Sequence, residues 1–156
     1  MSTQLSEISR CEICGSENLE SVLDLGKHAL GDDLIAVTEN RISEEYPVEV
    51  LFCRSCISCH QRYQVPKQQL FPESYHYRAR FTKDVLDGMN TFVASCEAKL
   101  GDLKGKTVVD VGCNDGSLLN AFREKGAVTV GIEPTGAWKD AAEEGHTVFN
   151  DFITKL

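Results

Sequence analysis

Residues 107–116 read Thr-Val-Val-Asp-Val-Gly-Cys-Asn-Asp-Gly, and this stretch decides the fold. The β-branched run at its start follows a turn at 104–106 and predicts a buried strand over 107–111. The residues after it predict a helix over 117–125, and Gly126 is well placed to end that helix. A glycine-bearing turn is therefore expected to join a first strand to a first helix.

The same alternation of strand and helix signals continues along the chain. Residues 128–132 predict a second strand, residues 136–144 a second helix, and residues 147–149 the start of a third strand. Alternation at this spacing implies a parallel sheet with right-handed crossovers. We therefore expect an α/β fold in which residues 105–156 form the first part of a Rossmann-like sheet.

The turn after the first strand predicts a nucleotide-type cofactor site. Gly112 lets the backbone bend sharply and approach a ligand, and the following helix presents unpaired N–H groups. A dinucleotide fingerprint would need two further glycines, where Asn114 and Ser117 stand. Asp115 would also repel a pyrophosphate. S-adenosylmethionine carries a sulfonium cation and no phosphate, so Asp110 and Asp115 are compatible with it.

Two acidic residues follow later strands of the predicted sheet. Glu133 ends the second strand, where a carboxylate can accept hydrogen bonds from the hydroxyl groups of a ribose. Asp151 follows the third strand and could accept a hydrogen bond from an adenine amino group. The alternative interpretation of Glu133 is a solvated carboxylate at a strand end.

The first third of the chain is rich in cysteine. The chain has seven cysteines, and four of them form two C-x-x-C pairs, Cys11 with Cys14 and Cys53 with Cys56. The N-terminus shows no secretion signal, and clustered cysteines in a reducing compartment usually bind metal. Two such knuckles supply the four thiolates of a tetrahedral zinc site. We expect a small β-rich subdomain between the knuckles.

The choice of zinc ligands leaves alternatives open. Cys56 and Cys59 form a third, overlapping C-x-x-C, and His60 could replace a cysteine. A redox pair or simply buried cysteines are also possible interpretations. We favour Cys53 and Cys56 because they follow a predicted strand. Cys59 and His60 are then expected in the core and on the surface of the subdomain, and Cys96 in a helix core.

The middle of the chain predicts a linker that runs into an amphipathic helix. Thr82 can cap the start of the helix and Gly101 can end it. Its apolar stripe consists of Val85, Met89, Phe92, Val93, Cys96 and Leu100. We expect three regions: a zinc-binding subdomain at 1–66, the linker and helix at 67–104, and the partial cofactor domain at 105–156.

Composition excludes several classes of function. The formal net charge is −8, which argues against a general binder of nucleic acid or of a membrane surface. No apolar run approaches the length of a membrane-spanning helix. We therefore expect a cytoplasmic protein whose partner is a small molecule.

The order of these motifs resembles that of the S-adenosylmethionine-dependent nucleotide-sugar C-methyltransferases. Two C-x-x-C pairs precede a tyrosine-rich segment at 71–77, Val-Val-Asp-Val-Gly-Cys-Asn-Asp-Gly-Ser-Leu-Leu at 108–119, and Gly-Ile-Glu-Pro at 131–134. The resemblance runs from about Cys11 to Phe152. It implies an N-terminal zinc-binding domain, an S-adenosylmethionine domain, and methyl transfer to a carbon of a nucleotide-linked deoxysugar.

The resemblance also implies roles for individual residues. The zinc ligands would be Cys11, Cys14, Cys53 and Cys56, and the cofactor contacts Asp110, Gly112, Cys113, Asn114, Gly116, Glu133, Pro134 and Asp151. Tyr75 and Tyr77 would lie beside the substrate. In that family a carbon next to a keto group is deprotonated, and the enolate attacks the methyl group, so a tyrosine could assist proton transfer. The alternative is that both tyrosines pack at a domain junction.

The chain departs from the family in two respects. Arg78 and Arg80 stand where the family has small serines, and they could grip a diphosphate or remain solvated. The general base of the family, a histidine in a Glu-His pair, would lie beyond Leu156, as would further strands. We therefore expect part of a longer enzyme, inactive alone, with one edge and one apolar face of its sheet uncovered. The competing hypothesis is a non-catalytic zinc module that acts through protein contacts.

Overall fold

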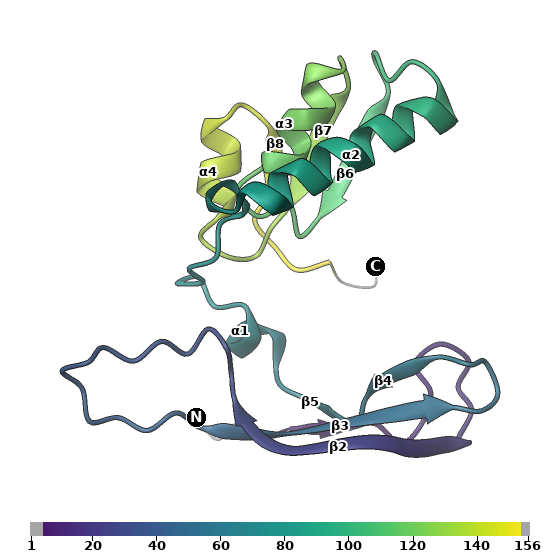
Figure 1. The fold of residues 1–156 in the computed structure, drawn as a ribbon, viewed down its shortest axis with the longest axis vertical. Helices are drawn as coiled ribbons and strands as arrows, with labels where there is room; N and C mark the ends of the chain where they lie inside the picture. Colours follow the sequence, from purple (N-terminus) through teal and green to yellow (C-terminus); the bar gives the residue numbers. More distant parts are fainter. Residues whose placement is uncertain (1–4, 154–156) are drawn as a thin grey trace. The chain divides into compact units, whose positions relative to one another are not determined.

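The computed structural model describes residues 5–153, and these divide into two compact units after Leu70 (Figure 1). The first unit contains five strands and a short helix. The second contains a parallel sheet and its helices. The predicted boundaries at 66 and 104 remain a proposal.

The first unit consists of antiparallel strands with little apolar core. Strands β2, β3 and β4 form one sheet in that order, and β1 pairs with β5. Nearly all of β2 is exposed, and the buried apolar residues described here are few: Cys11, Tyr46, Leu51 and Cys53. A unit this small needs another source of stability. The elements are β1 (Ser6–Glu7), β2 (Leu19–Ala29), β3 (Glu45–Cys53), β4 (Cys59–Gln61), β5 (Tyr63–Gln64) and α1 (Lys67–Leu70).

The second unit alternates helices with the strands of a parallel sheet. The strand order β6-β7-β8 follows the order of the chain, which confirms the predicted α/β fold. The first two strands fall where the β-branched runs predict them, and the two helices of the alternation are slightly shorter than predicted. The elements are η1 (Ala79–Phe81), α2 (Lys83–Leu100), β6 (Thr107–Val111), α3 (Ser117–Glu124), β7 (Val128–Ile132), α4 (Trp138–Glu143) and β8 (Thr147–Phe149).

The core of this unit lies on one face of the sheet. One cluster joins α2 to α3 through Val93 and Phe122, and Val108 of β6 packs against it. A second cluster contains Leu119 and Ala141 from α3 and α4. The opposite face is bare among the described residues, with exposed Val109, Val111, Val128 and Phe149. The expectation that β6 is buried is therefore correct for one face only. The exposed face agrees with the expectation that one apolar face of the sheet is uncovered.

Helix α2 confirms the predicted helix but only part of its apolar stripe. The helix ends at Leu100, and Gly101, at φ 75°, caps it by donating its N–H to the carbonyl of Glu97. Val93 is buried and Cys96 packs against the same cluster, whereas Phe92 and Leu100 are exposed. The stripe is covered only where α3 reaches it. Thr82 precedes the helix, but its side chain makes no capping hydrogen bond.

Helix α3 begins against the turn between α4 and β8. Gly116 precedes the helix at φ 80°, and a Cβ there would lie 2.9 Å from Cδ2 of His146 and 3.0 Å from Cβ of Ala141. The buried His146 ring contacts Thr129 Oγ1 and Asn120 Oδ1, and burial lowers its pKa. Glycine is therefore required both for the left-handed backbone and for the close packing.

No helix in residues 5–153 combines the length and the apolar character needed to cross a membrane.

We predict that Gly116→Ala destabilises the chain more than Gly105→Ala. Both glycines have positive φ, which costs alanine about 1–2 kcal/mol. A Cβ at Gly105 meets no atom within 4 Å, whereas one at Gly116 meets His146 and Ala141. Urea unfolding measures the difference in free energy of unfolding. Equal losses in the two variants would show that the packing around Gly116 is not as described.

Candidate functional site

The two C-x-x-C pairs come together in a single cluster. The sulfur atoms of Cys11, Cys14, Cys53 and Cys56 all lie within 4.8 Å of one another. The Sγ–Sγ distances are 3.6 Å between Cys11 and Cys56 and 3.7 Å between Cys14 and Cys53. A tetrahedron with Zn–S bonds of about 2.3 Å has S–S edges of about 3.8 Å. The cluster therefore has the dimensions of a four-thiolate zinc site.

Two backbone knuckles of the same design place these sulfurs. In the first, the N–H of Gly15 donates to the carbonyl of Cys11, and in the second the N–H of Ile57 donates to that of Cys53. The residue after each second cysteine has positive φ, 74° at Gly15 and 62° at Ile57. A β-branched residue is strained in that region. The second knuckle therefore holds a conformation that its sequence does not favour.

Hydrogen bonds polarise the thiols of the cluster. The Ser58 hydroxyl lies 3.5 Å from the sulfur of Cys11 and, with backbone N–H groups, lowers the pKa of that thiol to about 5. The N–H of Ser16 lowers the pKa of Cys14, but burial and the neighbouring sulfurs raise it to about 12. Because zinc binds thiolates, metal binding must release protons from this cluster and tightens as the pH rises.

Cys59 and His60 lie outside the four-sulfur cluster. Cys59 is exposed, whereas both ring nitrogens of His60 are buried without a hydrogen-bond partner among the described residues. The expectation that Cys59 is core and His60 surface was therefore wrong. In β4 consecutive side chains alternate between faces, and it is His60 that shares the register position of the buried Leu51.

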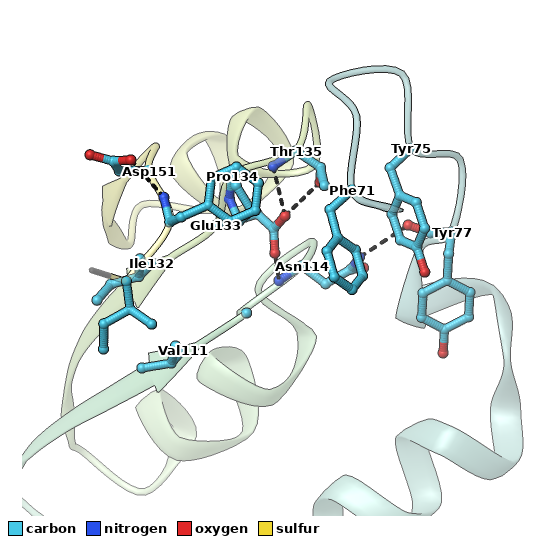
Figure 2. A pocket seen from close by; sticks show the side chains of 13 residues that line it. Phe71, Tyr75, Tyr77, Val111, Asn114, Ile132, Glu133, Pro134, Thr135 and Asp151 are labelled. Carbon is cyan, nitrogen blue, oxygen red and sulfur yellow. Dashed lines mark hydrogen bonds between the residues drawn. The ribbon is translucent and has the colours of Figure 1, made fainter. Parts of the chain in front are cut away.

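A pocket of about 330 Å³ lies at the carboxyl ends of the parallel strands (Figure 2). Its lining includes seven residues singled out from the sequence: Tyr75, Tyr77, Gly112, Asn114, Glu133, Pro134 and Asp151. Pockets in open α/β sheets form at this end, where loops from successive strands converge. Geometry thus brings the predicted tyrosines and most of the predicted cofactor residues to one cavity.

Glu133 is buried at the base of this pocket and is held by protein N–H and O–H groups. Its Oε2 accepts a hydrogen bond of 2.9 Å from the N–H of Asn114. Its Oε1 accepts from the N–H and the hydroxyl of Thr135, at 2.8 and 2.6 Å. A carboxylate has about four acceptor positions, so about one remains for a ligand. Figure 2 shows the carboxylate of Glu133 between Asn114, after β6, and Thr135, after β7.

Asn114 connects the turn to the tyrosine-rich segment. It has φ 51°, a left-handed conformation that asparagine tolerates better than most residues. Its side chain accepts a hydrogen bond from the N–H of Ala79 and donates one to the carbonyl of Tyr77. The neighbouring Asp115 is buried and accepts hydrogen bonds from Ser117 at the start of α3. Asp115 therefore provides an acceptor for the first N–H of α3.

Three predicted cofactor residues do not line the pocket: Asp110, Cys113 and Gly116. Burial, with a smaller effect of the Glu133 charge, raises the pKa of Asp110. Cys113 belongs to the core cluster with Leu119, and burial raises the pKa of its thiol to about 12. That any of these three residues contacts a cofactor remains a prediction.

Comparisons with known proteins support this description. Residues 11–71 match a family model described as a putative zinc-binding domain. Over 128 residues the chain is 29% identical to the C-methyltransferase NovU of Streptomyces niveus, an alignment that spans 81% of this chain but only 30% of that protein. Over most of its length the chain is therefore similar in sequence to a C-methyltransferase, and it spans less than a third of that protein.

Two solved structures of the magnesium protoporphyrin IX methyltransferase of Synechocystis PCC 6803 are also similar. The one with bound SAH has a TM-score of 0.39 at 24% identity and covers 42% of this chain and 34% of that enzyme. The one with bound SAM has a TM-score of 0.39 at 23% identity and covers 43% and 36%.

The pocket also contains residues that the sequence analysis left without a role. They are mostly apolar or aromatic. They come from the ends of β6 and β7, from the loop after β7, from the tyrosine-rich segment and from the residues after β8: Phe71, Val111, Ile132, Thr135, Phe152 and Ile153. Phe71 packs edge-to-face against Tyr75, with ring centroids 5.7 Å apart. The position of Val111 and Ile132 at the carboxyl ends of β-branched runs was the available signal. Phe152 and Ile153 follow the last strand and carried none.

We predict that the zinc-binding domain holds one zinc ion per chain and unfolds when the metal is removed. Its small apolar core cannot hold the knuckles, so a chelator should abolish its β-strand signal in circular dichroism. Cys53→Ser should weaken zinc binding more than about 100-fold, because it removes a ligand rather than an outer contact. Elemental analysis and competition with a chromophoric chelator measure both effects.

Cys59→Ser is the matched control for this experiment. It removes an exposed cysteine three residues after Cys56 and should leave the zinc content and affinity unchanged. Loss of zinc in Cys59→Ser, or its retention in Cys53→Ser, would contradict the assigned ligand set.

Proposed function

We propose that this chain carries the zinc-binding domain and part of the S-adenosylmethionine site of a C-methyltransferase. The observation that carries the proposal is the pocket in which Gly112, Glu133 and Asp151 meet at the ends of three successive parallel strands. The homology to a C-methyltransferase supports the reaction class. As part of this proposal we assign 1–66 to the zinc domain, 67–104 to the linker and helix, and 105–156 to the cofactor domain.

The chemistry of the pocket favours S-adenosylmethionine over a dinucleotide. None of the described residues that line it is basic, whereas Glu133 and Asp151 are acidic. A pyrophosphate would find no cation there, and a sulfonium compound needs none. The remaining acceptor position of Glu133 suits a ribose hydroxyl, and the apolar Ile132, Pro134 and Phe152 suit the faces of an adenine.

The zinc site has a structural role in this proposal. Four thiolates complete the coordination shell, so no position is left for a water or a substrate. The free energy of metal binding then stabilises a unit whose apolar core is small. When bound, S-adenosylmethionine supplies the methyl group, and the chain's own residues bind and orient the reactants.

The proposed acceptor is a carbon of a nucleotide-linked sugar. The support is the motif order shared with the nucleotide-sugar C-methyltransferases and the presence of Tyr75 and Tyr77 in the cofactor pocket. A tyrosine hydroxyl beside the acceptor can hydrogen-bond an enolate oxygen or relay a proton. We propose the cytoplasm as the compartment and a small molecule as the partner.

The competing hypothesis of a non-catalytic zinc module is not favoured. It gives no role to a pocket at the strand ends of the second unit, and it does not account for homology that extends over 128 residues to a methyltransferase.

We predict that the zinc-loaded chain binds S-adenosylhomocysteine and that Gly112→Ala weakens this binding by at least about tenfold. A side chain at Gly112 meets no protein atom, but Gly112 lines the pocket, so the added methyl group takes up space for the ligand. Isothermal titration calorimetry measures the affinity. Gly105→Ala has the same backbone cost of positive φ outside the pocket and should bind normally.

Failure of the zinc-loaded parent chain to bind would contradict the proposed site. Wild-type affinity in Gly112→Ala would place the ligand elsewhere. Tighter binding of NADH than of S-adenosylhomocysteine would favour a dinucleotide enzyme instead.

A further inference from the structure

The segment that carries the two tyrosines has no regular secondary structure between Tyr75 and Arg78. The backbone groups of such a segment need partners outside a helix or a sheet. The carbonyl of Glu73 accepts from the N–H of Gly136, where a Cβ would come within 2.6 Å of that oxygen. Further along, the N–H of Arg80 donates to Asp115 Oδ2 at 2.9 Å. The segment is therefore tied at both ends to the loops of the pocket.

Arg78 supplies partners for the middle of the segment. Its Nη1 donates to the carbonyl of Tyr75 at 2.8 Å and to that of Tyr77 at 2.9 Å. Its Nε donates to Oδ2 of Asp140 on α4 at 2.6 Å. One planar guanidinium thus bridges the backbone of the two tyrosines to helix α4.

This arrangement decides between the alternatives for Arg78. The side chain is 17% exposed, so it is not a solvated charge. Its Nε and Nη1 already serve a carboxylate and two carbonyls, and it does not line the pocket, so it is not placed to grip a diphosphate there. A guanidinium fixes several hydrogen bonds in one rigid plane, which lysine cannot do.

Arg80 differs from Arg78 although both contact Asp140. Its Nη2 lies 3.1 Å from Asp140 Oδ1, and its guanidinium lies over the ring of Phe81, 5.2 Å from the centroid. Its side chain is 45% exposed and, within residues 5–153, contacts Asp140 rather than a carbonyl of the tyrosine segment. Arg80 is therefore a natural control with the same charge beside the same carboxylate.

We propose that Arg78 is a positioning residue: by bridging Asp140 to the carbonyls of Tyr75 and Tyr77, it holds both tyrosine rings as a wall of the pocket. The bridge follows from these contacts alone, whereas the importance of that wall for a ligand rests on the proposed function. Asn114 supports the same wall from the turn, through its bond to the carbonyl of Tyr77 (Figure 2).

The test is fluorine NMR of the zinc-loaded chain labelled with 3-fluorotyrosine. The chain has four tyrosines, so four signals are expected, and Tyr→Phe variants assign them. Arg78→Gln should sharpen the signals of Tyr75 and Tyr77 and shift them toward the free amino acid. Tyr46 and Tyr63 belong to the first unit. Their signals should stay in place and report that the first unit remains folded.

Three further variants keep the inference falsifiable. Asp140→Asn should reproduce the effect in weaker form, Arg78→Lys should give an intermediate shift, and Arg80→Gln should leave both tyrosine signals in place. Unchanged signals of Tyr75 and Tyr77 in both Arg78→Gln and Arg78→Lys would overturn the inference. Equal effects of Arg78→Gln and Arg80→Gln would overturn it as well. They would show that the positive charge beside Asp140 matters, and not the hydrogen bonds of Arg78 to the tyrosine carbonyls.

Titration with S-adenosylhomocysteine separates this inference from the proposed function. We expect Arg78→Gln to weaken binding roughly tenfold and Arg80→Gln to change it less than about twofold, because only Arg78 holds the tyrosine wall. If the tyrosine signals respond to Arg78→Gln but the parent chain binds no ligand, the positioning role stands and the proposed function fails. A third outcome is that the tyrosine signals respond to Arg78→Gln while this variant binds S-adenosylhomocysteine with full affinity. Arg78 would then hold the tyrosine rings, and the expected effect on binding would be overturned.

Discussion

The pocket depends on one buried carboxylate. Glu133 accepts hydrogen bonds from Asn114, in the loop after β6, and from Thr135, in the loop after β7. Burying a charge is unfavourable unless hydrogen bonds replace its hydration, and three donors do so here. The backbone carbonyl of the same residue accepts from Asn150 in the loop after β8. Three strand ends are thus held to one residue, and the tyrosine segment is held in turn by Asn114.

The two units reach stability by different means. The second unit has two apolar clusters in which helices cover one face of a parallel sheet. The first has exposed strands and few buried side chains, and two of these, Cys11 and Cys53, belong to the four-sulfur cluster. In a small domain the free energy of metal binding can replace the stabilisation that a larger domain obtains from its apolar core. The left-handed Ile57 in the second knuckle is consistent with this, because a strained residue persists only where its surroundings hold it.

The elements with local signals were the ones predictable from the sequence. β6 and β7 are short β-branched runs between turn residues, and the structure places them at the predicted residues. The C-x-x-C pairs and the turn after β6 are likewise local patterns. The exposed outer face of β6 depends on which elements lie over it, and periodicity does not carry that information. The exposed Cys59 depends on strand register, which was not deduced.

The site shows the same division between local and distant information. Glu133 and Asp151 were singled out because each follows the end of a predicted strand, and both line the pocket. The role of Arg78 was missed because its partner Asp140 lies 62 residues away along the chain. A single sequence does not reveal which of several acidic residues an arginine meets. The sequence analysis therefore considered only a ligand or water as the partner of Arg78. The structure shows a carboxylate on helix α4 of the same unit instead.

The sequential strand order of the second unit has a consequence for how the chain forms during synthesis. β6, β7 and β8 pair in the order in which they are made, each with the strand completed just before it. The cysteines of the zinc knuckles also all precede the sheet in the chain. Contacts between near neighbours in sequence form quickly, because little loop entropy opposes them. On the ribosome the metal site can close first, and the sheet can then grow by one strand and helix at a time.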